Sequence, residues 1–160
     1  MKVSLLFPPT WHPSQPYLSL PSLTGFLAQG GVTNVTQRDL GIELLDEVVT
    51  KSYGGSLYQD LVDKRKALER ERTGETGPGS AEHLARIIES LDRFPYLIDR
   101  IELAKETLRG EGFYDMEAYR ESLFLIDKWL EVISTLYFPT RLTVVDNQFS
   151  TYSIYSSKDL

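Results

Sequence analysis

The strongest structural signal lies at the start of the chain, in the stretch KVSLLFPPTWHPSQPYLSLPSLTGFLAQGGVTNVTQRDL, residues 2–40. Residues 2–7 form a short apolar run with β-branched and aromatic members, and Pro8-Pro9 closes it. Such a run is typical of a buried strand. Residues 32–40 are again rich in β-forming residues and predict a second strand.

Between these two strands, residues 19–30 have the pattern of a helix. Ser19 can cap the first turn, and Pro21 fits within it. Gly30-Gly31 ends the helix, because a helix commonly stops at a residue that can adopt a positive φ. One face of the helix is apolar and carries Leu20, Leu23 and Leu27. Strand, helix and strand together predict a βαβ unit with parallel strands and a right-handed crossover.

The next hundred residues are helical in pattern. Residues 42–53 and 56–72 predict two helices, and the glycine-rich segment 73–80 predicts a loop. We expect Ser80 to cap a third helix, which Pro95 separates from a fourth. The apolar stripes of these two helices are Leu84, Ile87, Ile88 and Leu91 before the proline, and Leu97, Ile101, Ala104 and Leu108 after it.

The last helix has the clearest periodicity. Asp115 is its expected cap, and over residues 116–137 apolar side chains alternate three and four residues apart. This seam either packs inside the chain or joins two copies in a homodimer. Pro139 stops the helix, and residues 141–146 and 150–157 predict a hairpin joined by NQF. The seam consists of Met116, Tyr119, Leu123, Ile126, Leu130, Ile133 and Tyr137.

Composition excludes several classes of function. The chain has 160 residues, no cysteine and a formal net charge of −6. Without cysteine, this chain alone cannot hold a disulfide, a thiolate zinc site or an iron–sulfur cluster. Its only basic cluster, residues 63–72, is interrupted by acidic side chains, so we expect no nucleic-acid partner. The sequence shows neither a membrane-spanning run nor an export signal, so we expect a cytoplasmic protein with no membrane partner.

The loop after the first strand is the candidate binding segment. In open parallel sheets, ligands bind beyond the carboxyl ends of the strands, and residues 8–17, PPTWHPSQPY, follow such an end. The prolines hold this loop extended, so that Trp11, His12 and Tyr17 could offer a flat face to a large planar ligand. The alternative is a loop that covers the edge of the sheet while Trp11 fills a corner of the core.

The ordered string LLFPPTWHPSQPYLSLPSLTGFL, followed by GG and by QRDLGIELLDE, resembles the N-terminus of cobalamin-binding radical S-adenosylmethionine proteins. Members of this family open on a strand, a double proline, a variable loop and a helix, and their second strand ends in Asp. The resemblance is sharp over residues 3–46 and 137–160, and a subgroup with a long helical insertion matches best. It implies that the residues near the corrin or its upper-face substrate space are Pro8, Pro9, Thr10, Trp11, His12, Tyr17, Leu18 and Asp39.

Two motifs of this family are missing from the sequence. The Asp-x-His-x-x-Gly signature, whose His binds cobalt, is absent, because Thr10 and Ala81 precede His12 and His83 by two residues. Many family members also lack this signature. The Cys-x-x-x-Cys-x-x-Cys motif of the radical module is absent too, so this chain alone cannot perform radical S-adenosylmethionine chemistry. We therefore expect the iron–sulfur cluster and S-adenosylmethionine only in a C-terminal module that is missing from this chain.

The remaining polar residues allow more than one interpretation. His83 is expected to be exposed near a helix start, and His12 could reach a cobalt, a nucleotide tail or only a backbone carbonyl. An acidic group follows the second strand, where it could bind a divalent ion or simply favour the dipole of a helix. We assign no metal site. The acidic group is Asp39, Glu43, Asp46 and Glu47.

Together these patterns predict an α/β fold with a partial Rossmann-like parallel sheet. Its βαβ start covers residues 1–41, a helical insertion covers 42–138, and short strands in 139–160 continue into a missing C-terminal region. The expected function is the N-terminal portion of a cobalamin-binding domain of a radical S-adenosylmethionine enzyme, which positions the corrin and gates substrate access without catalysis of its own. Its partner would be cobalamin or another large planar ligand. The alternative is a stand-alone helical protein-interaction module with a small structural sheet, which could form a homodimer through residues 116–137.

Overall fold

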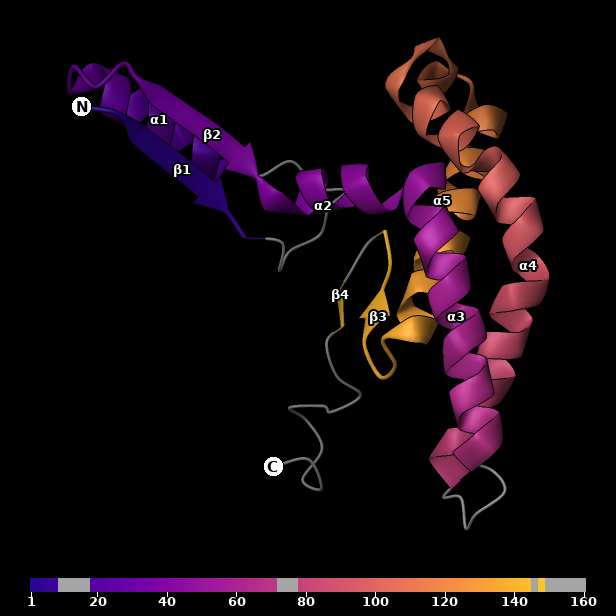
Figure 1. The fold of residues 1–160 in the computed structure, drawn as a ribbon. Helices are drawn as coiled ribbons and strands as arrows, with labels where there is room; N and C mark the ends of the chain where they lie inside the picture. Colours follow the sequence, from indigo (N-terminus) through magenta and orange to yellow (C-terminus); the bar gives the residue numbers. More distant parts are fainter. Residues whose placement is uncertain (9–17, 72–77, 145–146, 149–160) are drawn as a thin grey trace, which may run out of the picture. The chain divides into compact units, whose positions relative to one another are not determined.

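The computed structural model describes residues 1–8, 18–71, 78–144 and 147–148 (Figure 1). The chain is mostly helical and divides into two compact units, Met1–Val48 (unit 1) and Val49–Leu160 (unit 2). Within the described ranges, no helix combines the length and the apolar character that a membrane span needs.

Unit 1 is the predicted βαβ arrangement followed by a short helix. Its elements are β1 (Val3–Phe7), α1 (Ser19–Gln29), β2 (Val35–Asp39) and α2 (Leu40–Val48). The two strands run parallel, as their arrows in Figure 1 show, and both helices pack on them. The parallel pairing confirms the expectation from the sequence. A doubly wound sheet needs about four to six strands, so the Rossmann-like fold stays a prediction beyond this two-strand sheet.

The ends of α1 agree with the sequence at one terminus and not at the other. Gly31 has a φ of +83°, its N–H donates to the carbonyl of Ala28, and the N–H of Val32 donates to the carbonyl of Leu27 over 2.9 Å. This is the Schellman arrangement that a glycine permits. The predicted cap at Ser19 is wrong, because the helix already begins there, and Leu18 precedes it without a side-chain cap.

Unit 2 is built from three long helices and a short hairpin, and Figure 1 shows α3 and α4 running alongside each other. The central helix α4 packs against both of the other long helices. The elements of unit 2 are α3 (Lys51–Glu71), α4 (Pro78–Arg109), the 3-10 turn η1 (Glu111–Tyr114), α5 (Met116–Leu136), β3 (Arg141–Leu142) and β4 (Asn147–Gln148).

The core of unit 2 comes from heptad-like stripes on all three long helices. Buried positions spaced by three and four residues keep one face of each helix toward its neighbours. On α4 this stripe contains polar as well as apolar residues: His83, Ile87, Ser90, Phe94, Leu97, Ile101 and Ala104. The matching stripes are Gly54, Leu57, Leu61 and Leu68 on α3, and Ser122, Leu125, Trp129 and Val132 on α5.

The boundaries of α3 and α4 differ from the predicted ones. The break before α3 lies at residues 49–50 instead of at Gly54-Gly55, which are inside the helix. The helix α4 begins at Pro78, before the predicted cap Ser80, and proline suits a first helical position. It also continues through Pro95, where the sequence predicted a break.

The continuity of α4 has a physical reason. A proline inside a helix removes one backbone hydrogen bond and crowds the preceding turn. Pro95 itself faces solvent, but Phe94 and Leu97 on either side are both buried in the core. Breaking the helix at Pro95 would remove one of these side chains from the core, so packing keeps the helix continuous.

The last described elements of the chain agree in outline with those predicted from the sequence. Asp115 caps α5 as predicted, because its Oδ1 accepts the N–H groups of Glu117 and Ala118 at 2.9 and 3.1 Å. The hairpin exists, but its second strand is β4, in the segment expected to be the connection. The predicted strand 150–157 lies outside the described residues.

The predicted seam of α5 is mostly used inside unit 2. Ile126, Leu130 and Ile133 are buried in the core, which is the intramolecular packing that the sequence allowed. Met116 and Tyr137, at the two ends of the seam, are exposed.

Candidate functional site

The parallel pairing of β1 and β2 brings two predicted site residues, Pro8 and Asp39, to one edge of the sheet. Phe7, the last residue of β1, pairs with Asp39, the last residue of β2. Pro8 leaves β1 at this same edge. The carboxyl ends of parallel strands are where open sheets bind ligands, so unit 1 contains the start of such an edge.

The carboxylate of Asp39 has a structural partner. Its Oδ1 accepts the backbone N–H groups of Gly41 and Ile42 at 2.9 and 3.2 Å, which caps the first turn of α2. A short aspartate at a strand-to-helix junction is a favoured cap, so the sequence contained this signal as well. Asp39 therefore orients the chain as it leaves the sheet edge.

The other predicted site residues divide into two groups. Leu18 lies directly before α1 and is 74% exposed, and Pro8 is also exposed. The remaining residues of the predicted cofactor loop lie outside the described part of the chain: Pro9, Thr10, Trp11, His12 and Tyr17.

The acidic group after β2 is not arranged as a metal site. Glu43 forms a two-point ion pair with Arg38, in which the Nε atom donates to Oε1 over 2.9 Å and Nη2 donates to Oε2. The hydrogen bond from Arg38 holds the pKa of Glu43 below its ordinary value. Within the residues that the structure describes, no group of three or more His, Asp or Glu side chains could hold a metal ion.

His83 corrects an expectation from the sequence. It was predicted to be exposed, but it is only 8% exposed and lies on the buried stripe of α4. Its Nε2 is 2.7 Å from the carbonyl oxygen of Thr135 on α5, and because a carbonyl only accepts, Nε2 carries the proton. The spacing of four residues to Ile87 was the sequence signal that could have placed His83 in the core.

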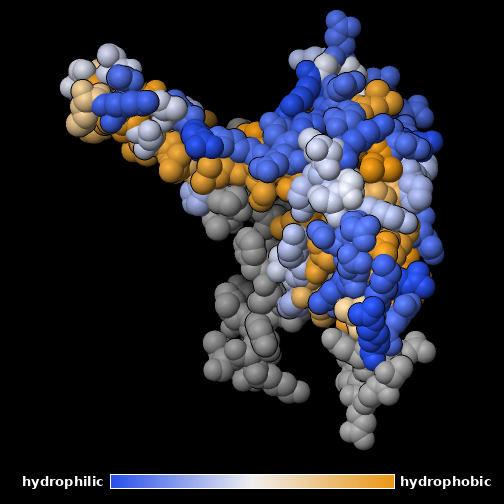
Figure 2. Space-filling view, in the orientation of Figure 1, coloured by the Kyte–Doolittle hydropathy of each residue, from blue (hydrophilic) through white to orange (hydrophobic). Residues whose placement is uncertain are grey.

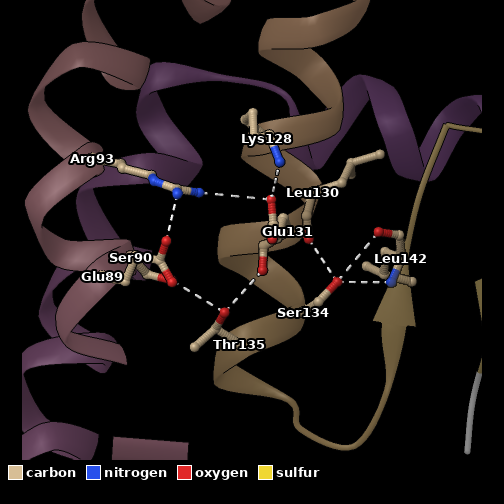
Figure 3. A network of polar contacts seen from close by, with 9 residues as sticks. All are labelled: Glu89, Ser90, Arg93, Lys128, Leu130, Glu131, Ser134, Thr135 and Leu142. Carbon is tan, nitrogen blue, oxygen red and sulfur yellow. Dashed lines mark hydrogen bonds and ion pairs between the residues drawn. The ribbon is translucent and has the colours of Figure 1, made fainter. Parts of the chain in front are cut away.

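A groove of about 350 Å³ lies in unit 2 between α4, α5 and residues 138–141. Sequence reasoning missed it, because its lining residues come from three separate segments. Figure 3 shows its ionic network, in which Arg93 on α4 and Lys128 on α5 both reach Glu131. Arg93 also pairs with Glu89 one turn earlier on its own helix. The carboxylates inside the groove are thus held by these two cations.

Hydroxyl groups tie the walls of this groove together (Figure 3). Ser90 Oγ on α4 donates to Thr135 Oγ1 on α5 over 3.1 Å. Ser134 Oγ accepts the N–H of Leu142 at 2.7 Å and donates to the carbonyl of Leu130 over 2.7 Å. These hydroxyls are buried: Ser90 and Thr135 join α4 to α5, and Ser134 holds β3, which carries Arg141, against α5.

Comparisons of this chain with protein-family models, with curated proteins and with solved structures found no match.

Proposed function

We propose that unit 1 is the first part of a cobalamin-binding domain of a radical S-adenosylmethionine enzyme, and that it helps to position the corrin in the cytoplasm. The observation that carries this proposal is the parallel pairing of Phe7 with Asp39. It brings Pro8, the first residue of the double proline, and Asp39, the strand-ending Asp of the resemblance, to one edge, as a ligand-binding parallel sheet requires.

The surface of unit 1 fits a large ligand with apolar faces. Leu6, Leu18 and Leu23 are all exposed, although unit 1 is small and needs its apolar residues for a core. Figure 2 shows hydrophobic residues at the surface of this part of the chain. Of these exposed residues, Leu18 lies directly before the first residue of α1. Along the chain, this end of α1 follows the loop that leaves the carboxyl end of β1.

In this proposal the described residues contribute a binding surface for the corrin, and they contribute no axial ligand to cobalt. His83 belongs to unit 2 and bonds to a backbone carbonyl, and the Oδ1 atom of Asp39 caps α2. When bound, cobalamin would supply methyl transfer or a related rearrangement together with a radical module that this chain lacks. In this proposal the helices of unit 2 belong to the helical insertion predicted for residues 42–138, which gates access to the substrate space.

A spectroscopic titration with hydroxocobalamin tests the proposal. It uses this chain and the longest natural polypeptide that contains it. We expect a saturable change in the corrin spectrum that the substitutions Trp11→Ala and Leu18→Asp weaken. Aspartate is a favoured residue directly before a helix, so Leu18→Asp should fold.

The matched control is Phe26→Asp, because Phe26 lies on the same helix and is 73% exposed. It is at the opposite end of α1 from Leu18, so its substitution should leave cobalamin binding unchanged. The absence of binding by the longer polypeptide, or equal losses for Leu18→Asp and Phe26→Asp, would refute the proposal.

A second candidate function is a helical interaction module that forms a homodimer through α5. The observation that favours it is the exposure of Met116 and Phe124 on the first half of this helix. Light scattering tests it: a dimer that becomes a monomer in Phe124→Glu supports this function, and a monomeric parent protein removes it. Leu130, which the sequence placed in the same seam, is buried in the core of unit 2 and takes no part in such a surface.

A further inference from the structure

The groove of unit 2 has a charge that differs from the rest of the protein. Its described lining contains four cationic side chains and two carboxylates, although the whole chain has a net charge of −6. Both carboxylates, Glu89 and Glu131, already pair with Arg93 or Lys128. The formal excess of two positive charges therefore belongs to the other two cations, Arg86 and Arg141.

Arg86, which lines the groove, is held in place by two contacts. Its guanidinium lies over the ring of Phe138, 5.4 Å from the centroid, and its Nη2 donates to Glu82 over 2.8 Å. Glu82 does not line the groove, and the pair is exposed on both sides. Exposed pairs of this kind are weak, so an anion in the groove can compete for the same guanidinium.

Among the described residues that line the groove, Arg141 is the cation without an ion pair to another described residue. It lies on β3, it is exposed, and it makes no ion pair with any residue in the part of the chain that the structure describes. The bonds from Ser134 to Leu142 fix the strand that carries it. The hydroxyl of the neighbouring Thr140 also makes no hydrogen bond with these residues and lines the same groove.

We propose that this groove binds the phosphate group of a small phosphate monoester between Arg86, Arg141 and Thr140. A phosphate monoester carries about −1.5 to −2 charges at neutral pH, which matches the excess of the groove. The planar guanidinium donates two parallel hydrogen bonds to phosphate oxygens, and a hydroxyl can donate a third. The groove volume of about 350 Å³ leaves room for a small organic group beside the phosphate. This site is independent of the cobalamin proposal.

Amide NMR spectra of the full chain at constant ionic strength test this site, with inorganic phosphate and glycerol phosphate as the probes. We expect saturable shifts in residues 138–142, and glycerol phosphate should bind at least as tightly as inorganic phosphate. Arg141→Gln and Arg86→Gln should each weaken binding about tenfold, which is the loss of one charge-assisted pair.

The matched control is Arg120→Gln, which makes the same change of charge at an exposed position on α5 outside the groove. It should bind both probes like the parent protein. Far-UV circular dichroism checks the fold, and Arg141 is exposed, so its substitution leaves the core intact. The proposal is overturned by shifts that map elsewhere, by parent-like binding in Arg141→Gln, or by binding of inorganic phosphate without glycerol phosphate.

Discussion

Replacing Trp129 with alanine is expected to lower the free energy of unfolding by about 3–5 kcal/mol, because it removes the largest side chain of the core and leaves a cavity. Trp129 is 0% exposed and lies on the buried stripe of α5. Its ring contacts that of Phe94 on α4 with centroids 5.5 Å apart, and it also faces Gly54 on α3. The side chain thus joins all three long helices.

Phe124→Ala is the matched control for this prediction. Phe124 is an aromatic residue on the same helix but is 58% exposed, so its loss should change the free energy of unfolding by about 0.5 kcal/mol or less. Urea unfolding followed by far-UV circular dichroism measures both variants. Similar effects of the two substitutions would contradict the central position of Trp129 in the core.

Adjacent glycines on α3 should respond to alanine in opposite directions. A Cβ atom on Gly54 would lie 2.7 Å from Cη2 of Trp129 and 2.9 Å from Cδ1 of Ile98. Trp129 is rigid and enclosed, so Gly54→Ala should cost about 1–3 kcal/mol through overpacking. At Gly55 a Cβ would meet nothing within 4 Å, so Gly55→Ala should gain up to about 1 kcal/mol from helix propensity.

The same unfolding experiment compares the two glycine variants. They differ by one position and add the same methyl group to the same helix. The sign of the change therefore reports the space around each Cα atom. A stabilising effect of Gly54→Ala would mean that α3 does not approach Trp129 and Ile98 as closely as the structure shows.

The candidate site in unit 1 could be predicted in part. The pairing of β1 with β2 and the position of Asp39 at the strand end followed from the order of strand, helix and strand. The groove in unit 2 could not be predicted, because its partners are far apart in the chain. Ser90 and Thr135, which both line the groove, are 45 residues apart. No local pattern specifies which of these side chains meet.

The sequence by itself determined the features that act within one or two turns of the chain. Gly31 ends α1 at a positive φ, Asp115 caps α5 by accepting the N–H groups of Glu117 and Ala118, and an apolar run makes β1. Backbone sterics and short-range hydrogen bonds control such features, and they depend on neighbouring residues alone.

Only the tertiary structure decided where the local signals are overruled. The helix α4 continues through Pro95, α3 continues through Gly54, and His83 is buried instead of exposed. The local conformational preference of a single residue, such as that of proline or glycine against a helix interior, amounts to a few kcal/mol at most. Packing three long helices together buries many side chains at once, and that larger gain in free energy sets the helix boundaries and the buried faces.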